Sequence, residues 1–297
     1  MAGSTPALAT GLAINGYRMQ FVSCVPLVKY TLVDPNPYLM CGVLNDVLEV
    51  ITPGIEHHGW RVVMTPHPGE LDILTPLWGF SESPTDTFTP TETLTSFTTL
   101  VRLKSSTANV ITTSSCVMDR VVLRGQKGNN PMTLQMDILG KSSAEGSTFS
   151  PTSITRDAPF PFTGGALSAG GSSRAIDACV IVWNNHIRKR FNNSATADVL
   201  QNVRQTLHIG VNMPMTDDED DLVTTAVSSS RHSGIALNLG WTFNSKRHIW
   251  DVTKAVWPDA TWPGITGKEA EIRSYQYYQC VKSGSSAVCT ITQDNTT

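Results

Sequence analysis

Short runs of alternating apolar and polar residues dominate the chain and predict a mainly β protein. In the stretch "YRMQF", for example, the side chains of Tyr17, Met19 and Phe21 fall on one face of a strand. Similar runs recur along both halves of the sequence, and clusters of Gly, Asn and Pro separate them, as turns require. The pattern therefore predicts many short strands joined by loops.

Helical spacing is found at two places. The stretch "GELDILTPLWGF" carries Leu71, Leu74 and Leu77 on one helical face, and Pro76 is expected near the first turn of this helix or at a kink. The second helix is predicted to follow the acidic run and to continue through "VTTAV". Each half of the chain is thus expected to contain one short α-helix.

The two halves carry similar stretches in the same order. "AINGYRMQF" is matched by "VWNNHIRKRF", and "GWRVVMTPHPGELDILTPLW" by "RQTLHIGVNMPMTDDEDDLVTTAV". In a third match, "LRGQKGNNPMTLQMDILGK" aligns with "LNLGWTFNSKRHIWDVTKA" at a constant offset, with these pairs: Leu123 with Leu237, Asn130 with Asn244, and Asp137 with Asp251. The preserved order predicts an internal duplication of one β-rich domain.

A stretch rich in Ser, Pro and Gly separates the two halves. Residues 142–173 are predicted to form a linker or a long connecting loop. The first domain is then expected to span residues 1–141 and the second residues 174–297.

The composition narrows the class of protein. Of the 297 residues, 40% are hydrophobic and only 16% are charged, with a net charge of −3. This profile suits a β-rich protein with many loops, or one that buries much of its surface against copies of itself. It does not favour tight nucleic-acid binding over the whole surface. We expect no membrane insertion, no signal peptide, and cysteines that remain free thiols.

The acidic run Asp217–Asp221 is predicted to begin a helix. Thr216 is placed as an N-cap with Glu219 three residues later, the pattern of a capping box, and acidic side chains are favoured in a first helical turn. The alternative is a metal site, which would need ligands from separate segments or an EF-hand pattern, and the sequence contains neither. We therefore expect no metal ion here.

The stretch "HIRKRF" is the one basic cluster. On a strand, His186, Arg188 and Arg190 would face one way, with Ile187, Lys189 and Phe191 on the other face. The residues could contact phosphate, form a solvated strand face, or pair with acids of a neighbouring subunit. Arg188, Lys189 and Arg190 are the candidate contact residues between subunits or between rings.

No constellation in the sequence favours an enzyme. It contains no nucleophile elbow, P-loop or dinucleotide-binding glycine motif, and His57 and His58 have no recognisable third metal ligand nearby. The tryptophans lie among apolar neighbours and are predicted to be in the core or in subunit contacts: Trp60, Trp78, Trp183, Trp241 and Trp250. We expect no catalytic residues and no cofactor.

The order of these stretches resembles that of the major tail tube proteins of long, non-contractile-tailed bacteriophages. Each half has a strand pair ("AINGYRMQF", "VWNNHIRKRF"), then a strand, turn and helix ("HPGELDILTPLWGF", "MTDDEDDLVTTAV"), then a closing strand pair. The ending "WPGITGKEAEIRSYQYYQCVKSGSSAVCTITQDN" is similar to the last strands of that family. The resemblance covers nearly the whole chain.

The resemblance implies a tail-tube β-sandwich or barrel domain, present twice, each copy with a flanking helix. Three chains would close a pseudo-hexameric ring, and stacked rings would form the hollow tube through which DNA is ejected. The expected location is the virion tail, after assembly in the host cytoplasm. The expected partners are other copies of the chain, the tape measure, terminator and baseplate proteins, and DNA in passage.

Two further readings stay open. One is another component with the same fold, such as a baseplate hub, a tail-completion protein or a secretion-tube protein, which would differ in copy number and ring stacking. The other is a β-sandwich binding module, which would need an exposed aromatic platform and would not polymerise.

Overall fold

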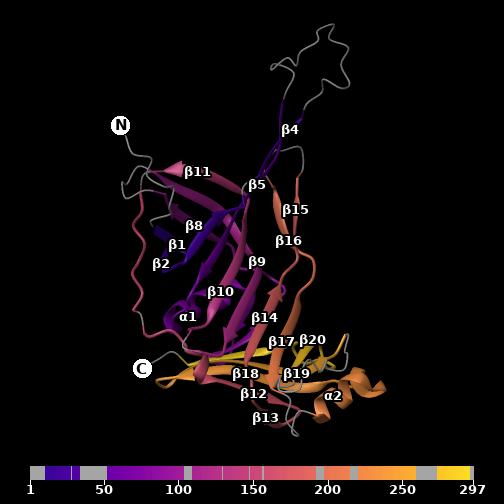
Figure 1. Cartoon of the computed structure of the whole chain (residues 1–297). Coiled ribbons are helices and arrows are strands. Elements are labelled where there is room, and N and C mark those ends of the chain that lie inside the picture. Colours follow the sequence, from indigo (N-terminus) through magenta and orange to yellow (C-terminus); the bar gives the residue numbers. More distant parts are fainter. Residues whose placement is uncertain are drawn as a thin grey trace.

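The computed structural model describes residues 11–27, 29–33, 52–103, 109–128, 130–146, 148–155, 157–191, 197–214, 220–258 and 273–294. Figure 1 shows an elongated molecule built mainly of antiparallel strands. The predicted mainly β class is confirmed. The described residues include two α-helices, α1 (Pro68–Leu77) and α2 (Asp220–Val227), and two short 3-10 helices, η3 (Phe162–Gly164) and η4 (Ser229–His232).

Two layers of strands form the first half. One layer contains β3 (Ser23–Pro26), β5 (Thr52–Met64), β10 (Thr133–Gly140) and the C-terminal part of β9 (Val110–Gln126). The other contains β2 (Tyr17–Met19), β1 (Gly11–Ile14), β8 (Phe97–Arg102), the N-terminal part of β9, and β11 (Ser142–Gly146). Strand β9 belongs to both layers because it bends near Ser115, whose φ is +49°.

The second half extends the first of these layers and adds a further one. Strands β14 (Ala178–Asn184), β17 (Thr206–Pro214) and β20 (Arg273–Cys280) continue the layer that holds β9 and β10. The added layer holds β13 (Ser172–Arg174), β12 (Gly165–Ala169), β18 (Ile235–Phe243), β19 (Lys246–Val256) and β21 (Thr290–Asp294). Strands β7 (Thr87–Pro90) and β6 (Phe80–Glu82) of the first half attach to β21.

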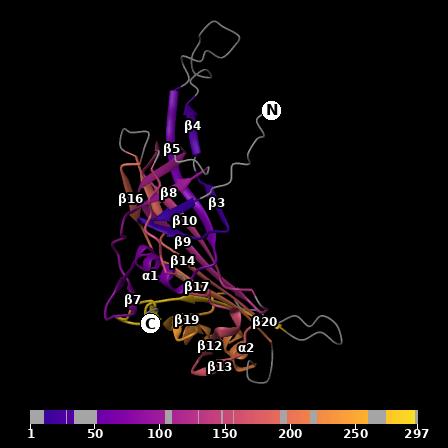
Figure 2. The same cartoon turned by 90° about the vertical axis from the view of Figure 1, so that its left-hand side faces the viewer.

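Two hairpins project from these layers. Strand β4 (Lys29–Val33) pairs with the start of β5, and β15 (Ile187–Arg190) pairs with β16 (Val199–Asn202) in a separate two-stranded sheet. Figure 2 shows β4 and β5 rising together from the body of the molecule, with β16 beside them. The two hairpins therefore lie toward the same end of the protein.

The pairing of β9 with β14 joins the two halves into one sheet. Residues Gln126 to Arg120 of β9 lie opposite Ala178 to Asn184 of β14 in an unbroken antiparallel register. The resulting layer runs through seven strands, in the order β3, β5, β10, β9, β14, β17 and β20. Alternation fixes its two faces: Cys179, Ile181 and Trp183 point into the core, whereas Val180 and Val182 belong to the other face.

Turn chemistry explains the tight hairpins of each half. Asn15 and Gly16 between β1 and β2 have φ values of +52° and +81°, and Asn244 and Ser245 between β18 and β19 have +49° and +65°. Positive φ at both central positions is the geometry that suits the twist of a two-residue hairpin. Asn and Gly adopt it at the lowest steric cost, so these turns are encoded locally.

Helix α1 has the predicted apolar face, with Leu71, Leu74 and Leu77 all buried. The expected position of Pro76 is wrong, because this proline lies in the last turn. There it removes one intrahelical hydrogen bond just before the helix ends, which a terminus tolerates. At the other terminus the buried Glu70 carboxylate accepts hydrogen bonds from the backbone N–H groups of His67 (3.2 Å) and Gln20 (3.0 Å).

The first strand pair and the expected linker differ from the sequence predictions. Tyr17 is 37% exposed although Met19 is buried, so the predicted common face of "YRMQF" holds only in part. Residues 142–173, expected as a linker or loop, contain β11, β12, β13 and η3. Ser and Gly fit here because β11 and β13 are edge strands with little side-chain burial.

The order of elements is similar in the two halves, but the strand pairing differs. In each half a long strand leads into a helix (β5 into α1, β17 into α2), and a hairpin follows later (β9–β10, β18–β19). However, β1 pairs with β2, whereas β14 pairs with β9 and β17 rather than with β15. The duplication and its domain boundaries stay predictions.

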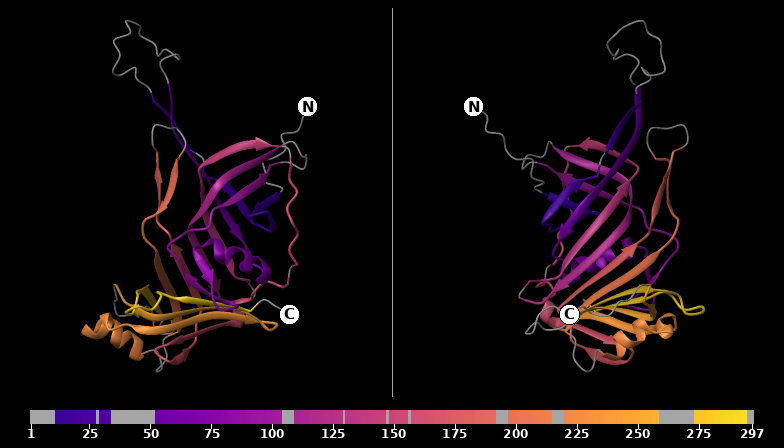
Figure 3. Two further views of the ribbon diagram at one scale, coloured as in Figure 1. Left: turned by 180° about the vertical axis from the view of Figure 1, so that it is seen from behind. Right: turned by 45° about the vertical axis from the view of Figure 1, so that its right-hand side comes forward.

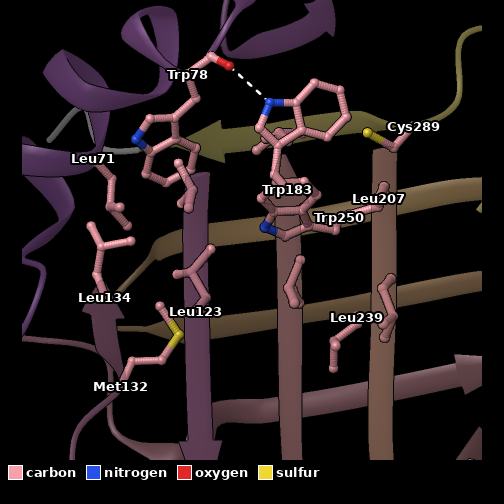
Figure 4. Packing of buried hydrophobic residues seen from close by; sticks show 14 of the residues in the cluster. Leu71, Trp78, Leu123, Met132, Leu134, Trp183, Leu207, Leu239, Trp250 and Cys289 are labelled. Carbon is pink, nitrogen blue, oxygen red and sulfur yellow. Dashed lines mark hydrogen bonds between the residues drawn. The ribbon is translucent and has the colours of Figure 1, made fainter. Parts of the chain in front are cut away.

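One hydrophobic core extends through both halves, and Trp78 is fully buried within it. Figure 4 shows its indole beside Trp250 and its backbone oxygen directed at Trp183. The rings of Trp78 and Trp250 stack with centroids 6.3 Å apart, and the Trp78 oxygen accepts bonds from Trp183 Nε1 (2.8 Å) and Asn185 Nδ2 (2.9 Å). The predicted burial of Trp60, Trp78, Trp183, Trp241 and Trp250 is confirmed.

Candidate functional site

The basic strand β15 has the predicted two faces. Arg188 and Arg190 are exposed, whereas Ile187 and Lys189 are half-buried. Across the hairpin, Arg188 lies opposite Gln201 and Arg190 opposite Val199. In the described part of the chain neither arginine forms an ion pair, so both guanidinium groups remain available to a partner. Their role in a subunit contact stays a prediction.

Lys189 is engaged within its own chain. Its Nζ donates a hydrogen bond to the backbone oxygen of His58 on β5, at 3.1 Å. Desolvation lowers the pKa of Lys189, and the nearby negative charge of Asp119 opposes this shift. Asp119 also accepts a hydrogen bond from the backbone N–H of Ile187, at 2.8 Å. These contacts hold the base of the hairpin against the main sheet, which leaves Arg188 and Arg190 as the outward-facing pair.

A depression lies beside the hairpin of β15 and β16. Arg188, Lys189, Arg190, Phe191 and Gln201 line a depression of about 550 Å³. A depression with two guanidinium groups at its rim can accept carboxylate or phosphate oxygens, because a guanidinium presents a planar fork of donors. The site is therefore suited to binding an anionic group.

The acidic run leads into α2, as predicted. The helix begins at Asp220, whereas Thr216 and Glu219 of the expected capping box lie outside the described residues. Asp221 has a specific partner that the sequence did not reveal. Its Oδ2 lies 2.9 Å from the Nη2 of Arg174 on β13, whose side chain is only 4% exposed. The ion pair attaches the start of α2 to the edge of the sheet.

The sequence hid Arg174 because it directly follows the Ser- and Gly-rich stretch, residues 142–173, that was expected to be a linker. The only available signal was its position as the sole basic residue of "SAGGSSRAID". A buried guanidinium must have a counter-charge or hydrogen-bond partners. Loss of Asp221 would therefore leave a buried charge on Arg174 uncompensated, whereas the exposed Asp221 could be solvated by water without Arg174.

The substitution Asp221→Asn is expected to reduce the free energy of unfolding by about 1–2 kcal/mol, because it removes the counter-charge of a buried guanidinium. Water screens part of the pair, since the Asp221 side chain is 66% exposed, which keeps the effect below that of a fully buried pair. As a matched control, Asp218→Asn should cost between a few tenths and about 1 kcal/mol, the range of a helix-dipole interaction. Urea denaturation of both variants measures the change in the free energy of unfolding. Equal changes in the two variants would contradict a stabilising role of the ion pair.

Two exposed tyrosines form a surface that the sequence analysis missed. Tyr275 and Tyr277 on β20 are 62% and 36% exposed, and the ring of Tyr277 stacks on His208 with centroids 5.5 Å apart. Tyr275 lies across Gly210, where a Cβ atom would approach its hydroxyl to an impossibly short distance. The alternation in "SYQYYQC" could have placed both rings on one face. The result is a flat aromatic surface at the edge of the seven-stranded sheet.

A groove of about 710 Å³ lies where three loops meet. Its walls come from the end of β7, the connection between β16 and β17, and the segment before β21, and they include Trp183, Arg204 and Lys282. The lining contains both basic residues, Arg204 and Lys282, and an acidic one, Glu92, together with apolar side chains. The groove therefore has no single charge that would select a ligand.

His58 and the described cysteines are buried or half-buried. His58 is buried, and the side chain of His57 lies outside the described residues. The predicted free thiols are confirmed for Cys24, Cys116, Cys179, Cys280 and Cys289, so no Cys280–Cys289 bridge is present. Burial raises the pKa of Cys24 and Cys179 to about 12 and that of Cys116 to about 11, which suppresses thiolate formation.

Within the described ranges, no group of three or more His, Cys, Asp and Glu side chains could hold a metal ion. Among the same residues no helix has the length and apolar character needed to cross a membrane. No protein-family model matches the chain, and no curated protein sequence matches it either.

Proposed function

We propose that the chain is a structural protein that assembles with copies of itself into stacked rings, forming a hollow tail tube for the passage of bacteriophage DNA. One observation carries the proposal: the seven-stranded sheet ends in two edge strands, β3 and β20. In the described part of the chain β3 pairs only with β5, and Arg273–Tyr278 of β20 pair only with β17. Both edges are therefore open to strands of other copies.

Exposed apolar side chains gather at these two edges. Val22 and Val25 at the β3 edge are 71% and 51% exposed, and Tyr275 and Tyr277 mark the β20 edge. Open edges with apolar side chains favour association, and most monomeric proteins protect them with charges or prolines. Because the two edges differ, pairing β20 of one copy with β3 of the next is heterologous, the type of contact that closes into a ring when the rotation between copies is a whole fraction of a turn.

The dimensions of such a ring suit a conduit for DNA. Three copies would contribute about twenty-one strands to a closed barrel. At roughly 4.8 Å per strand and a tilt of about 40°, the diameter of this barrel, measured between backbones on opposite sides, would be ~40 Å. Inward-pointing side chains would reduce the opening to roughly 30 Å, which admits a double helix. This estimate supports three chains per ring.

The charge of the sheet's solvent-facing side bears on DNA passage. A conduit should be neutral to acidic, because phosphate contacts to Lys and Arg multiply along the duplex. Because side chains alternate along the strands, this side carries three basic residues, Arg61, Arg120 and Arg124. It also carries two acidic residues, Asp137 and, at the bulge of β9, Asp119. Arg61 and Asp137 form an ion pair at 2.7 Å. The described charged residues on this side of the sheet thus carry a slight excess of positive charge. This differs from the neutral or acidic inner surface expected of a DNA conduit.

A second candidate function has a specific observation in its favour. A β-sandwich binding module needs an exposed aromatic platform, and Tyr275, Tyr277 and His208 form one. Such a module would bind a ligand with a flat apolar face as a monomer. The two functions differ in oligomeric state, so the assembly experiment separates them.

We expect the purified protein to form rings of three chains and hollow tubes, as measured by mass photometry and negative-stain microscopy. The variant Val25→Lys should reduce ring formation, because a charge on an open edge opposes strand pairing. Val203→Lys is the matched control, since Val203 is 61% exposed and lies between β16 and β17, outside both edge strands. A protein that stays monomeric at every concentration would contradict the proposal, and six chains per ring would contradict the two-domain account.

A further inference from the structure

The hairpin of β15 and β16 carries a positively charged hollow that lies apart from the seven-stranded sheet. Both views of Figure 3 show this hairpin, in orange, standing beside the body of the molecule, toward the end from which β4 and β5 project. The two strands form a small sheet of their own. The hollow, called the basic depression below, has a volume of about 550 Å³ and is lined by Arg188, Lys189, Arg190, Phe191 and Gln201. Pockets of roughly 300–1,000 Å³ are the size that holds small organic ligands.

The positive charge of the basic depression is not balanced by its own lining. Arg188 and Arg190 are exposed, and no acidic side chain of the described residues lines the depression. Asp119 accepts a backbone hydrogen bond at the base of β15, and the backbone N–H of Asp198 donates to the oxygen of Arg190 at 2.9 Å. Neither aspartate belongs to the lining. The depression therefore favours an anionic ligand.

Hydrogen-bond donors share the outer face of this hairpin. Arg188 and Arg190 are two positions apart on one strand, so they lie on the same face with their Cα atoms roughly 7 Å apart. Gln201 lies directly opposite Arg188 on β16, and its side chain is also exposed. Guanidinium groups bind phosphate oxygens through paired N–H donors, and a glutamine amide can donate a further bond. This face can therefore hold a phosphate between the two strands.

The hairpin is fixed in place before any ligand binds. Lys189 Nζ donates a hydrogen bond to the backbone oxygen of His58 at 3.1 Å, and the backbone N–H of Ile187 donates to Asp119 at 2.8 Å. These bonds attach β15 to β5 and β9 of the main sheet. A strand that is already held loses less entropy on binding, so the two arginines can be used efficiently.

Phe191 gives the basic depression an aromatic wall. This half-buried side chain directly follows Arg190 in the chain. A carboxylate of a neighbouring protein would use the arginines but not an aromatic wall. A nucleotide carries both an anionic phosphate and a flat base, and bases stack on aromatic side chains beside cationic grooves. The bases of a duplex are already stacked on one another, so this combination favours a free nucleotide or a single strand.

We propose that the basic depression binds a nucleotide, either as a free molecule or within a single strand. Its phosphate contacts Arg188 and Arg190, and its base packs against Phe191. Gln201 donates a further hydrogen bond to the phosphate. The inference goes beyond the proposed function and does not depend on it, because the depression is formed within one chain and lies on the separate two-stranded sheet.

Fluorescence anisotropy of a short, fluorescein-labelled oligothymidylate tests the inference. The double variant Arg188→Ala with Arg190→Ala should bind this probe about tenfold or more weakly than the wild-type protein. The slope of log affinity against log salt should become shallower by about 1.4, because each phosphate contact contributes roughly 0.7 for a single strand. Phe191→Leu should weaken binding by about fivefold or more without changing the slope, since stacking carries no charge. The matched control is Arg124→Ala with Arg247→Ala, which removes the same charge from exposed positions on β9 and β19 and should leave the affinity nearly unchanged.

Competition distinguishes the possible sources of the nucleotide. Displacement of the probe by thymidine monophosphate at an equal phosphate concentration would identify a free nucleotide as the ligand, whereas displacement only by unlabelled oligothymidylate would identify a single strand. Inorganic phosphate and a duplex of the same length should both compete more weakly, because neither offers an unstacked base to Phe191.

Four results would overturn the inference. They are no binding by the wild-type protein, equal losses of affinity in the control variant, unchanged binding in both depression variants when circular dichroism shows intact folding, and competition by polyglutamate as strong as that by oligothymidylate. The last result would assign the two arginines to a carboxylate of a partner protein. Ring and tube formation by the same variants is measured separately, so a failure of nucleotide binding leaves the proposed function standing.

Discussion

The substitution Trp78→Ala is expected to lower the free energy of unfolding by about 3–5 kcal/mol, the usual range for removing a buried large aromatic side chain. Trp78 is fully buried, stacks on Trp250 at 6.3 Å and meets His248 edge-on at 6.2 Å. Trp250 and His248 belong to β19 in the second half, whereas Trp78 ends α1 in the first. Its removal opens a cavity where the two halves meet.

The effect should be specific to the ring and not to the backbone. The carbonyl of Trp78 that binds Trp183 and Asn185 remains in the alanine variant, so those hydrogen bonds can persist. Val203→Ala is the control, because an exposed side chain outside both edge strands should change stability by no more than about 0.5 kcal/mol. Urea unfolding is measured at several protein concentrations, since assembly stabilises the folded state. A loss below about 1 kcal/mol for Trp78→Ala would show that the two halves do not depend on this contact.

Acidification is expected to destabilise the protein through His248. This side chain is fully buried on β19, and Trp250 Nε1 donates a hydrogen bond to its Nε2 at 2.9 Å. Burial lowers the pKa of His248 to about 3, against an ordinary value of 6.5, although a contact with Gln293 opposes the shift. The folded protein therefore keeps the imidazole neutral at pH values where the unfolded chain protonates it.

The direction of the pH effect follows from this depressed pKa. The contribution of His248 is fully present above the unfolded pKa and is lost as the pH falls toward the folded value. The loss amounts to about 2 kcal/mol by roughly pH 5 and approaches ~5 kcal/mol near pH 3, at about 1.4 kcal/mol per pH unit. Urea midpoints measured between about pH 7 and pH 5 check this, because one extra proton binds on unfolding.

The variant His248→Gln should remove this part of the pH dependence, because glutamine can accept the bond from Trp250 and does not titrate in this range. His232→Gln is the control, since His232 is exposed on η4 and should leave the pH dependence unchanged. An unchanged slope in His248→Gln would mean that another group is responsible for acid sensitivity.

The sequence by itself determined much of the local structure. Strand alternation, the Asn-Gly turn after β1 and the leucine spacing of α1 depend on residues only a few positions apart, so they can be read from the chain. The two faces of β15 were predicted for the same reason, and so was the burial of the tryptophans. Periodicity also indicated a helix after the acidic run, although it gave no partner for Asp221.

Tertiary structure decided which of these elements meet. The pairing of β9 with β14, the ion pair of Arg174 with Asp221 and the bond from Lys189 to His58 join residues 47 or more positions apart, and no local pattern encodes such partners. Strands inside the supposed linker were hidden for a related reason, because an edge strand buries little and needs no apolar run. Side-chain period fixes which face of a strand is buried, whereas the choice of neighbour depends on the packing of the whole core.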